Sequence, residues 1–185
     1  MNKAVELLYD EHEIIMDAIS VAKQLGKKTE QPELYEQQVF ALISFFREYA
    51  DKYHHFKEEE ILFPEMIKAN ELLESGVVME MLDNHEDFRM LIAEIETLTK
   101  EKKYTLAQDK LEEYVEALTD HIAVENEEVF EIATTLFSEK ELENIYFRFK
   151  DIDYELGENN KEGLRERLNK IKKRNEVDFI TSDTK

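Results

Sequence analysis

The sequence contains no cysteine and has only four glycines and two prolines among its 185 residues. The absence of cysteine excludes disulfides, iron–sulfur ligation, thiolate zinc sites and cysteine nucleophiles. Glycine and proline usually form the many turns of an all-β fold, so their scarcity favours helices. The abundant glutamate, lysine, leucine and alanine are strong helix formers, and the composition therefore predicts an all-α fold.

Long apolar runs are also missing. No stretch approaches the ~20 apolar residues of a membrane-spanning helix, and the opening MNKAVELLYDEHEI lacks the apolar segment of a signal peptide. The formal net charge of −20 repels nucleic acid and anionic membranes. We therefore expect a cytoplasmic protein whose partners include neither nucleic acid nor membrane, and the sequence identifies no protein partner.

Apolar residues recur at helical spacing through most of the chain. This pattern predicts four long helices, over residues 3–25, 33–63, 77–100 and 105–137. Because the predicted loops are short, the helices should form an up-down-up-down four-helix bundle. Pro64 is expected to end or kink the second helix, since proline clashes with the preceding turn. Thr105-x-x-Gln108 resembles a capping box that would begin the fourth.

The remaining residues predict one or two additional C-terminal helices. Ser138-x-x-Glu141 is a capping box that begins a fifth helix, and Gly157 should end it. A basic helix is expected over residues 161–174, followed by a polar tail. We therefore divide the chain into residues 1–157, the bundle with its fifth helix, and residues 158–185, the basic helix and tail.

Four of the five histidines belong to an internal repeat. The first predicted helix contains Asp10-Glu11-His12-Glu13, which is similar to Asp83-Asn84-His85-Glu86 in the third. The second contains His54-x-x-x-Glu58, which matches His121-x-x-x-Glu125 in the fourth. The two helical hairpins thus look like copies of one unit, which predicts a pseudo-two-fold site between them.

Each of the four helices carries a histidine on its apolar stripe, and two carry a glutamate one turn later. A single such histidine is more often a core residue with satisfied hydrogen bonds than a ligand. Four together with two glutamates favour metal, because a buried carboxylate is costly unless it is paired or bound to a cation. The candidate ligands are His12, His54, Glu58, His85, His121 and Glu125.

Two sets of histidine and carboxylate predict two metal ions with bridging carboxylates. Imidazole and carboxylate suit iron, manganese and zinc. Ferritin-like di-metal bundles use Glu-x-x-His spacing, whereas Leu82 and Leu118 stand three residues before His85 and His121. The sequence therefore argues against the ferritin-like class.

The residues resemble the hemerythrin family, specifically its bacterial HHE cation-binding branch, over about residues 3–137. The motifs are Glu11-His12, His54-His55-Phe56-Lys57-Glu58-Glu59, Asn84-His85-Glu86 and His121-Ile122-Ala123-Val124-Glu125-Asn126. The resemblance implies a non-haem di-iron centre inside a four-helix bundle. It implies that the four bundle histidines are terminal ligands and that Glu58 and Glu125 bridge the irons, together with an oxo or hydroxo group. Zinc and manganese are the alternatives to iron.

This sequence departs from the oxygen-carrying hemerythrins at the third helix. Those proteins have two ligand histidines four residues apart, and the second of these positions is Arg89 here, which counts against reversible oxygen storage. His55 either restores a fifth imidazole or is a partly exposed histidine at the helix flank. Neighbouring residues lie about 100° apart on a helix, so His54 and His55 would face different irons.

Two charged residues near the motifs, Arg89 and Glu59, are candidates for contacts with the metal ligands. Arg89 either pairs with a carboxylate or lies on the surface, and we favour the surface interpretation. Glu59 is either solvated or a hydrogen-bond partner of a ligand.

Three functions remain open. The favoured one is a di-iron protein that binds or senses a small diatomic ligand, O2 or NO, because the mixed site leaves coordination positions open. The alternative is an enzyme, either a di-iron oxidoreductase or a protein that handles iron in the repair of iron–sulfur clusters, with repair ranked lower for lack of cysteine. A metal-free structural bundle is the least favoured.

Overall fold

The computed structural model describes residues 2–182, except for the side chains of residues 27, 28 and 174–182. Every regular element in this range is helical. The first bundle helix is α1 (Lys3–Gln24), extended by the 3₁₀ segment η1 (Leu25–Lys28). The second is built from α2 (Pro32–Phe45), the π-helical segments η2 (Phe46–His55) and η3 (Glu58–Leu62), and α3 (Phe63–Ala69).

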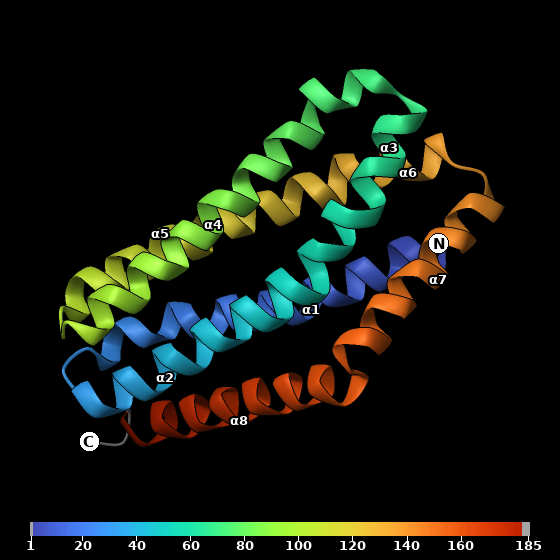
Figure 1. Cartoon of the computed structure of the whole chain (residues 1–185). Coiled ribbons are helices and arrows are strands. Elements are labelled where there is room, and N and C mark those ends of the chain that lie inside the picture. The colour runs from blue at the N-terminus through green and yellow to red at the C-terminus, as the bar shows by residue number, and fades with distance from the viewer. Residues whose placement is uncertain (1, 183–185) are drawn as a thin grey trace.

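The second half of the bundle repeats this arrangement. After the 3₁₀ segment η4 (Glu71–Ser75), the third bundle helix is α4 (Val77–Lys100). The fourth is built from α5 (Tyr104–Val124), the π-helical segment η5 (Glu125–Val129) and α6 (Phe130–Leu136). The four helices alternate in direction, which confirms the predicted bundle (Figure 1).

The second bundle helix does not end at Pro64. The Phe63 N–H donates to the carbonyl of Glu58, five residues back, so a π turn comes directly before the proline. A π turn lacks the four-residue hydrogen bonds that proline would break. The helix therefore continues to Ala69, and the chain changes direction between α2 and α3 (Figure 1). The helix therefore bends near Pro64, as one of the two predictions had it, but it does not end there.

The helix ends agree with the sequence in one case and differ in another. The proposed capping box at Thr105 is wrong, because α5 begins one residue earlier with Lys103 as its N-cap and no side-chain cap. The Ser138 capping box is confirmed: the Ser138 hydroxyl accepts from the Glu141 N–H, and the Glu141 carboxylate accepts from the Ser138 N–H.

Two C-terminal helices pack along the outside of the first bundle hairpin (Figure 1). They are α7 (Glu139–Leu156) and α8 (Glu158–Ser182), joined at Gly157. The last helix is longer than the predicted 161–174, and of the predicted polar tail residues 183–185 lie outside the described residues. Leu164 and Leu168 of α8 are buried among bundle side chains, so α8 shares the bundle core.

The apolar core is divided into two clusters along the bundle axis. One contains the buried apolar residues of α1 from Ile15 onwards, those of α2 and those of the first part of α5. The other contains the first turns of α1 and α4 together with α3, α6 and α7. On each bundle helix the histidines and glutamates lie at the boundary between the two clusters in sequence, and on the fourth Ile122 of the cluster described first falls between His121 and Glu125. The fold thus places a buried polar layer between two apolar ends.

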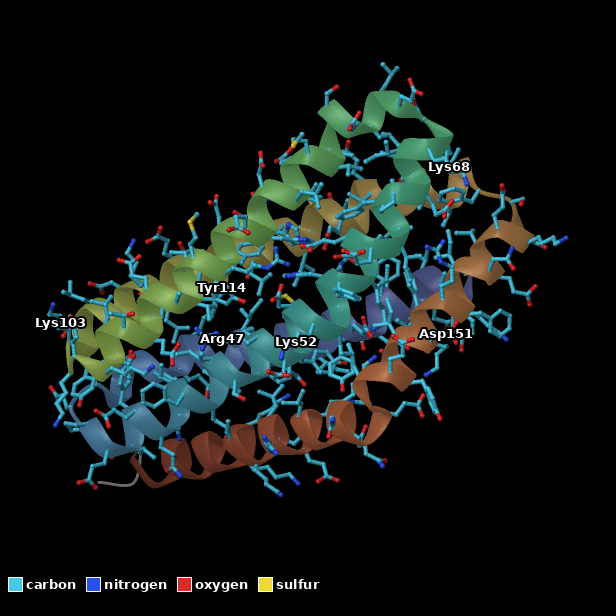
Figure 2. All side chains as sticks on the ribbon, viewed as in Figure 1. Arg47, Lys52, Lys68, Lys103, Tyr114 and Asp151 are labelled. Atoms are coloured by element: carbon cyan, nitrogen blue, oxygen red, sulfur yellow. The ribbon has the colours of Figure 1, made fainter. Side chains whose placement is uncertain are left out.

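Charged side chains cover the outside of the bundle. Lys52, Lys68 and Lys103 are exposed, whereas Tyr114 is buried in the interior (Figure 2). Within the described residues, no helix combines the length and the apolar character that crossing a membrane requires.

Candidate metal centre

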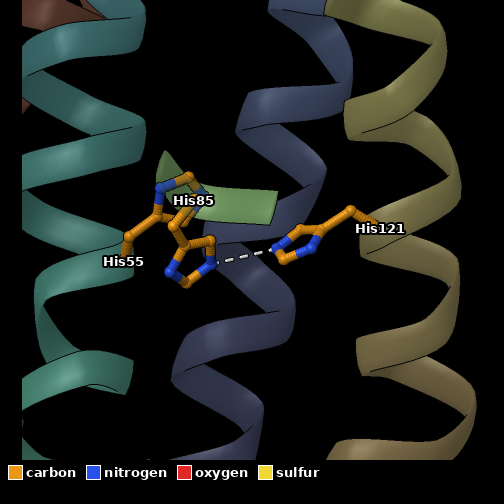
Figure 3. Close-up of side chains that lie close together, drawn as sticks. All are labelled: His55, His85 and His121. Carbon is orange, nitrogen blue, oxygen red and sulfur yellow. Dashed lines mark hydrogen bonds between the residues drawn. The ribbon is translucent and has the colours of Figure 1, made fainter. Parts of the chain in front are cut away.

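Seven buried side chains of the polar layer gather in two clusters. The first cluster consists of His12, His54, Glu58 and Glu125, and the second cluster of His55, His85 and His121; within each, the ligand atoms lie within 4.8 Å of one another. Figure 3 shows the three imidazoles of the second cluster converging from three helices. The structure brings together all seven residues proposed as ligands, and their role as ligands stays a prediction.

Adjacent histidines on the second bundle helix serve different clusters. His54 belongs to the first cluster and His55 to the second, as expected for neighbours that point in different directions. The side chains are only 1% and 2% exposed, so a partly exposed His55 is ruled out. Both lie in the π-helical segment η2, where each turn holds one more residue than in an α-helix. A wider turn lets two consecutive side chains point into the bundle.

The two glutamates lie between the clusters. Glu125 has one oxygen 3.1 Å from Nε2 of His12 and the other 3.2 Å from Nε2 of His121. Glu58 Oε2 lies 3.6 Å from Nε2 of His54 and 3.7 Å from Nε2 of His85. Each carboxylate therefore contacts one imidazole of each cluster, which is the arrangement that a bridging ligand requires.

The outer nitrogens of three imidazoles contact oxygen acceptors. His12 Nδ1 lies 2.7 Å from Oδ1 of Asn126, and His54 Nδ1 lies 3.1 Å from Oε2 of Glu11. His85 Nδ1 lies 2.8 Å from Oε1 of Glu59. An oxygen acceptor at Nδ1 keeps the proton on that nitrogen and directs the Nε2 lone pair into the site. These histidines are thus oriented for metal binding through Nε2.

The supporting residues follow the internal repeat. The residue before the histidine of the first helix, Glu11, contacts the histidine of the second, and its equivalent Asn84 contacts Nδ1 of His121 at 3.4 Å. The residue after each glutamate, Glu59 or Asn126, contacts the histidine of the other hairpin. This arrangement is the pseudo-two-fold site that the repeat predicted. The two halves differ, because a carboxylate in one stands where an amide stands in the other.

Several buried polar atoms fit a cation. Within the described residues, all four carboxylate oxygens of Glu58 and Glu125, and Nε2 of His55, are buried without a hydrogen-bond partner. The Nε2 atoms of His12 and His54 face each other at 2.8 Å. Burying such groups without compensation is costly. A metal ion in each cluster would satisfy them, and the imidazole and carboxylate donors suit iron, manganese and zinc.

The protonation states follow from burial and from the neighbouring charges. Burial and repulsion from Glu125 raise the pKa of Glu58 well above its usual range. Burial also acts to raise the pKa of Glu125, but His121 and His12 outweigh it and hold that pKa well below the usual range. Burial and the nearby His12 lower the pKa of His54 to about 4. The imidazole of His54 is therefore neutral at neutral pH and free to bind metal.

The family model of the hemerythrin HHE cation-binding domain matches residues 3–133. The chain belongs to the hemerythrin family. No curated protein and no solved structure matches it. The hemerythrin match ends within α6, so that α7 and α8 lie outside it. The polar layer of this cation-binding domain lies wholly inside the matched range.

Arg89 has a role that corrects the surface interpretation. Its guanidinium donates to Asp51 Oδ1 at 2.9 Å and to Glu59 Oε1 at 2.7 Å. Glu59 in turn accepts from His85, so Glu59 is a hydrogen-bond partner of a candidate ligand and Arg89 holds it in place. Burial acts to raise the pKa of Glu59, but the bonds to His85 and Arg89 outweigh it and lower that pKa.

A pocket of about 220 Å³ reaches the hemerythrin site from the surface between η2 and α4. Apolar side chains form much of its wall, including Phe46, Phe88 and Ile92, and it ends at His55 and His85. The Arg89 ion pairs with Asp51 and Glu59 lie at its edge. The second cluster is therefore the one closer to solvent on this face.

A buried charge cluster that the sequence does not predict lies beside the first metal-ligand cluster. It consists of Glu11, Lys57, Asp153 and Lys161. The repeat gave a signal for Glu11, which occupies the position of Asn84, but we treated it only as part of a motif. Asp153 and Lys161 gave no signal, because they reach the site only through the packing of α7 and α8.

Proposed function

We propose that this hemerythrin-family protein holds two iron ions, one in each cluster, and binds or senses a small diatomic ligand, O2 or NO. The observation that carries the proposal is the pair of clusters with Glu58 and Glu125 between them. Imidazole and carboxylate are donors that suit iron. Bound ferrous iron would supply the electrons for binding O2 or NO.

The two clusters offer unequal numbers of donors. If both carboxylates are shared, the first cluster adds two imidazoles and the second adds three. We therefore assign the open coordination position to the ion held by His12 and His54. The polar layer as a whole is buried between two apolar ends of the bundle, and a charged ligand would lose its hydration on entering it. A small neutral ligand suits these surroundings.

The first test is the metal content of protein produced in iron-sufficient cells. We expect about two irons per chain, because the chain has two clusters of donors that suit iron. The reduced protein should then change its visible spectrum on addition of O2 or NO. Absence of metal, or a single zinc, would contradict the di-iron proposal, and a spectrum indifferent to both gases would contradict the ligand.

A pair of matched variants makes the metal test specific. Glu125 and Glu128 lie on the same segment η5, but Glu125 is buried between the clusters and Glu128 is exposed. Glu125→Ala should lower the iron content, since it removes a donor shared by both ions. Glu128→Ala should retain the iron content of the unaltered protein. Equal iron content in the two variants would argue against Glu125 as a bridging ligand.

A further inference from the structure

We infer that the C-terminal helices α7 and α8 form part of the metal centre, with Asp153 and Lys161 as positioning residues that hold Glu11 against His54. The inference rests on the proposed metal site and extends it beyond the residues that the family model matches. No part of α7 or α8 lies within that match.

The packing of the two helices brings their junction to the level of the polar layer. α7 packs on one apolar end of the bundle through Leu142, Ile145 and Phe149. α8 packs on the other apolar end through Leu164 and Leu168. Because the helices cover opposite ends, the turn between them must lie beside the layer that separates those ends.

A tyrosine of the second bundle helix fixes this turn. The Tyr53 hydroxyl lies 2.8 Å from the carbonyl oxygens of both Leu156 and Gly157. Tyr53 is next to His54 in the chain and belongs to the same segment η2. The turn is therefore tied directly to the segment that carries two candidate ligands.

Two amines and two carboxylates pair at the turn, and the partly exposed Lys150 lies 3.7 Å from Asp153 Oδ2 at their edge. Lys57 Nζ lies 2.8 Å from Glu11 Oε1 and 2.7 Å from Asp153 Oδ1. Lys161 Nζ pairs with Glu11 Oε1 and lies 2.9 Å from Asp153 Oδ2. Lys57, Glu11 and Asp153 are at most 2% exposed. Buried charges need such pairing. Removal of the Lys161 amine would leave the carboxylates of Glu11 and Asp153 to share the single buried amine of Lys57.

Glu11 connects this charge cluster to the metal-ligand cluster. Its Oε1 faces the two lysines, and its Oε2 accepts the hydrogen bond from His54 Nδ1 at 3.1 Å. A carboxylate acceptor at Nδ1 fixes the ring and makes the other nitrogen a better donor to metal. The equivalent contact to His121 comes from the uncharged Asn84. The C-terminal helices therefore act on the first cluster and leave the second unaffected.

The experiment compares Lys161→Met with Lys172→Met on the same helix. Lys172 forms a partly exposed ion pair with Asp17, away from the charge cluster, and serves as the control. The double variant Asp153→Asn/Lys161→Met removes one carboxylate along with the amine, which leaves Glu11 paired with Lys57. Circular dichroism should show that all the proteins are folded.

The first measurement needs no metal. In ¹⁵N-histidine-labelled metal-free protein, Lys161→Met should shift the His54 ring signals and leave those of His121 in place. The second is titration with cobalt(II), followed by visible absorption. Lys161→Met should weaken one of two cobalt sites roughly tenfold, the lower end of the range for residues that support a metal ligand. The double variant should recover most of that loss.

Three results would overturn the inference. His54 signals in Lys161→Met that equal those of Lys172→Met would show that the lysine does not act on the ligand. If Lys161→Met weakened both cobalt sites equally, the result would indicate a general packing role. The same would follow if the double variant bound cobalt more weakly than Lys161→Met does. Shifted His54 signals in a protein that binds no cobalt would contradict the proposed metal site alone, and the positioning of His54 would stand.

Discussion

At the scale of single residues, Glu58 shows how a binding site costs stability. Its side chain is fully buried, and within the described residues neither oxygen has a hydrogen-bond partner. Burial and Glu125 raise its pKa well above the usual range. In the unfolded chain the Glu58 carboxyl ionises as the pH rises above its ordinary pKa of 4.5. In the folded protein the same carboxyl stays protonated to a considerably higher pH. Rising pH therefore favours unfolding through this residue.

Glu58→Gln should stabilise the metal-free protein at pH 7. The amide keeps the shape of the side chain and does not ionise in the unfolded chain, so we expect a gain of about 1–3 kcal/mol in the free energy of unfolding, because each pH unit above the ordinary pKa of 4.5 costs the folded carboxyl about 1.4 kcal/mol. The gain should vanish at pH 4, where the carboxyl is protonated in both states. Urea denaturation at both pH values measures it, with the exposed Glu128→Gln as control. A loss of stability at pH 7 would contradict the prediction.

His54 should make the metal-free protein sensitive to acid. Its pKa is 6.5 when unperturbed and about 4 in the folded protein, because of burial and of His12. Between these values the unfolded chain binds a proton that the folded protein refuses, so stability is lost as the pH falls from 6.5 towards 4. The shift corresponds to roughly 3 kcal/mol. His54→Gln should flatten this part of the pH–stability profile, and parallel profiles would contradict the assignment.

At the scale of elements, the α7–α8 turn depends on one glycine. Gly157 has a φ of 94°, a backbone conformation that residues other than glycine rarely adopt. A Cβ there would lie 3.0 Å from Nδ2 of Asn160. Gly157→Ala should therefore cost about 1–3 kcal/mol in the free energy of unfolding. Gly163 lies inside α8 and has open space around the position of a Cβ. Gly163→Ala should gain about 0.5–1 kcal/mol.

Thermal unfolding of the two alanine variants separates these effects. If the two variants had equal melting temperatures, the strained conformation at residue 157 would be contradicted. Because the turn also carries Asp153 and Lys161 to Glu11, Gly157→Ala should weaken cobalt binding at the first cluster as well. Gly163→Ala should leave it unchanged.

The π-helical segments are the elements in which sequence and structure differ most. They occur in the second and fourth bundle helices, at His54, Glu58 and Glu125. Apolar periodicity predicted regular α-helix there, because a π turn changes the spacing for only a few residues. Such turns are often found at functional sites. Here they let the consecutive residues His54 and His55 both point inward.

At the scale of the whole molecule, the candidate ligands connect all four bundle helices. The first cluster draws on α1, η2, η3 and η5, and the second on η2, α4 and α5. Metal ions that bind the two clusters only in the folded protein stabilise it by mass action. Metal binding and global stability should therefore change together.

Metal removal should lower the melting temperature. At a free metal concentration of 100 times the dissociation constant, each ion contributes about 2.7 kcal/mol to the free energy of unfolding. We expect the chelator-treated protein to melt earlier and added iron(II) or cobalt(II) to restore the original temperature under anaerobic conditions. The variant His121→Ala, which lacks one candidate ligand, should recover less. A melting temperature indifferent to metal would contradict a site that spans the four helices.

Helical periodicity is enough to predict the bundle and the gathering of the candidate ligands. The apolar stripe fixes which face of each helix is buried, and His12, His54, His85 and His121 lie on those stripes, so burial of the stripes brings them together. The same logic placed Glu58 and Glu125 one turn after two of the histidines. Local periodicity was sufficient because each of these residues lies on the inward face of its own helix.

The residues that support those ligands are found only in the folded protein. Arg89 reaches Glu59 from a different helix, and Lys161 lies 150 positions along the chain from Glu11. Contacts of this kind depend on how helices pack and not on any spacing within one of them. For the same reason the sequence predicts α8 only as a basic helix. The charge of Lys161 is visible in the sequence, but folding alone brings to it the buried carboxylates of Glu11 and Asp153.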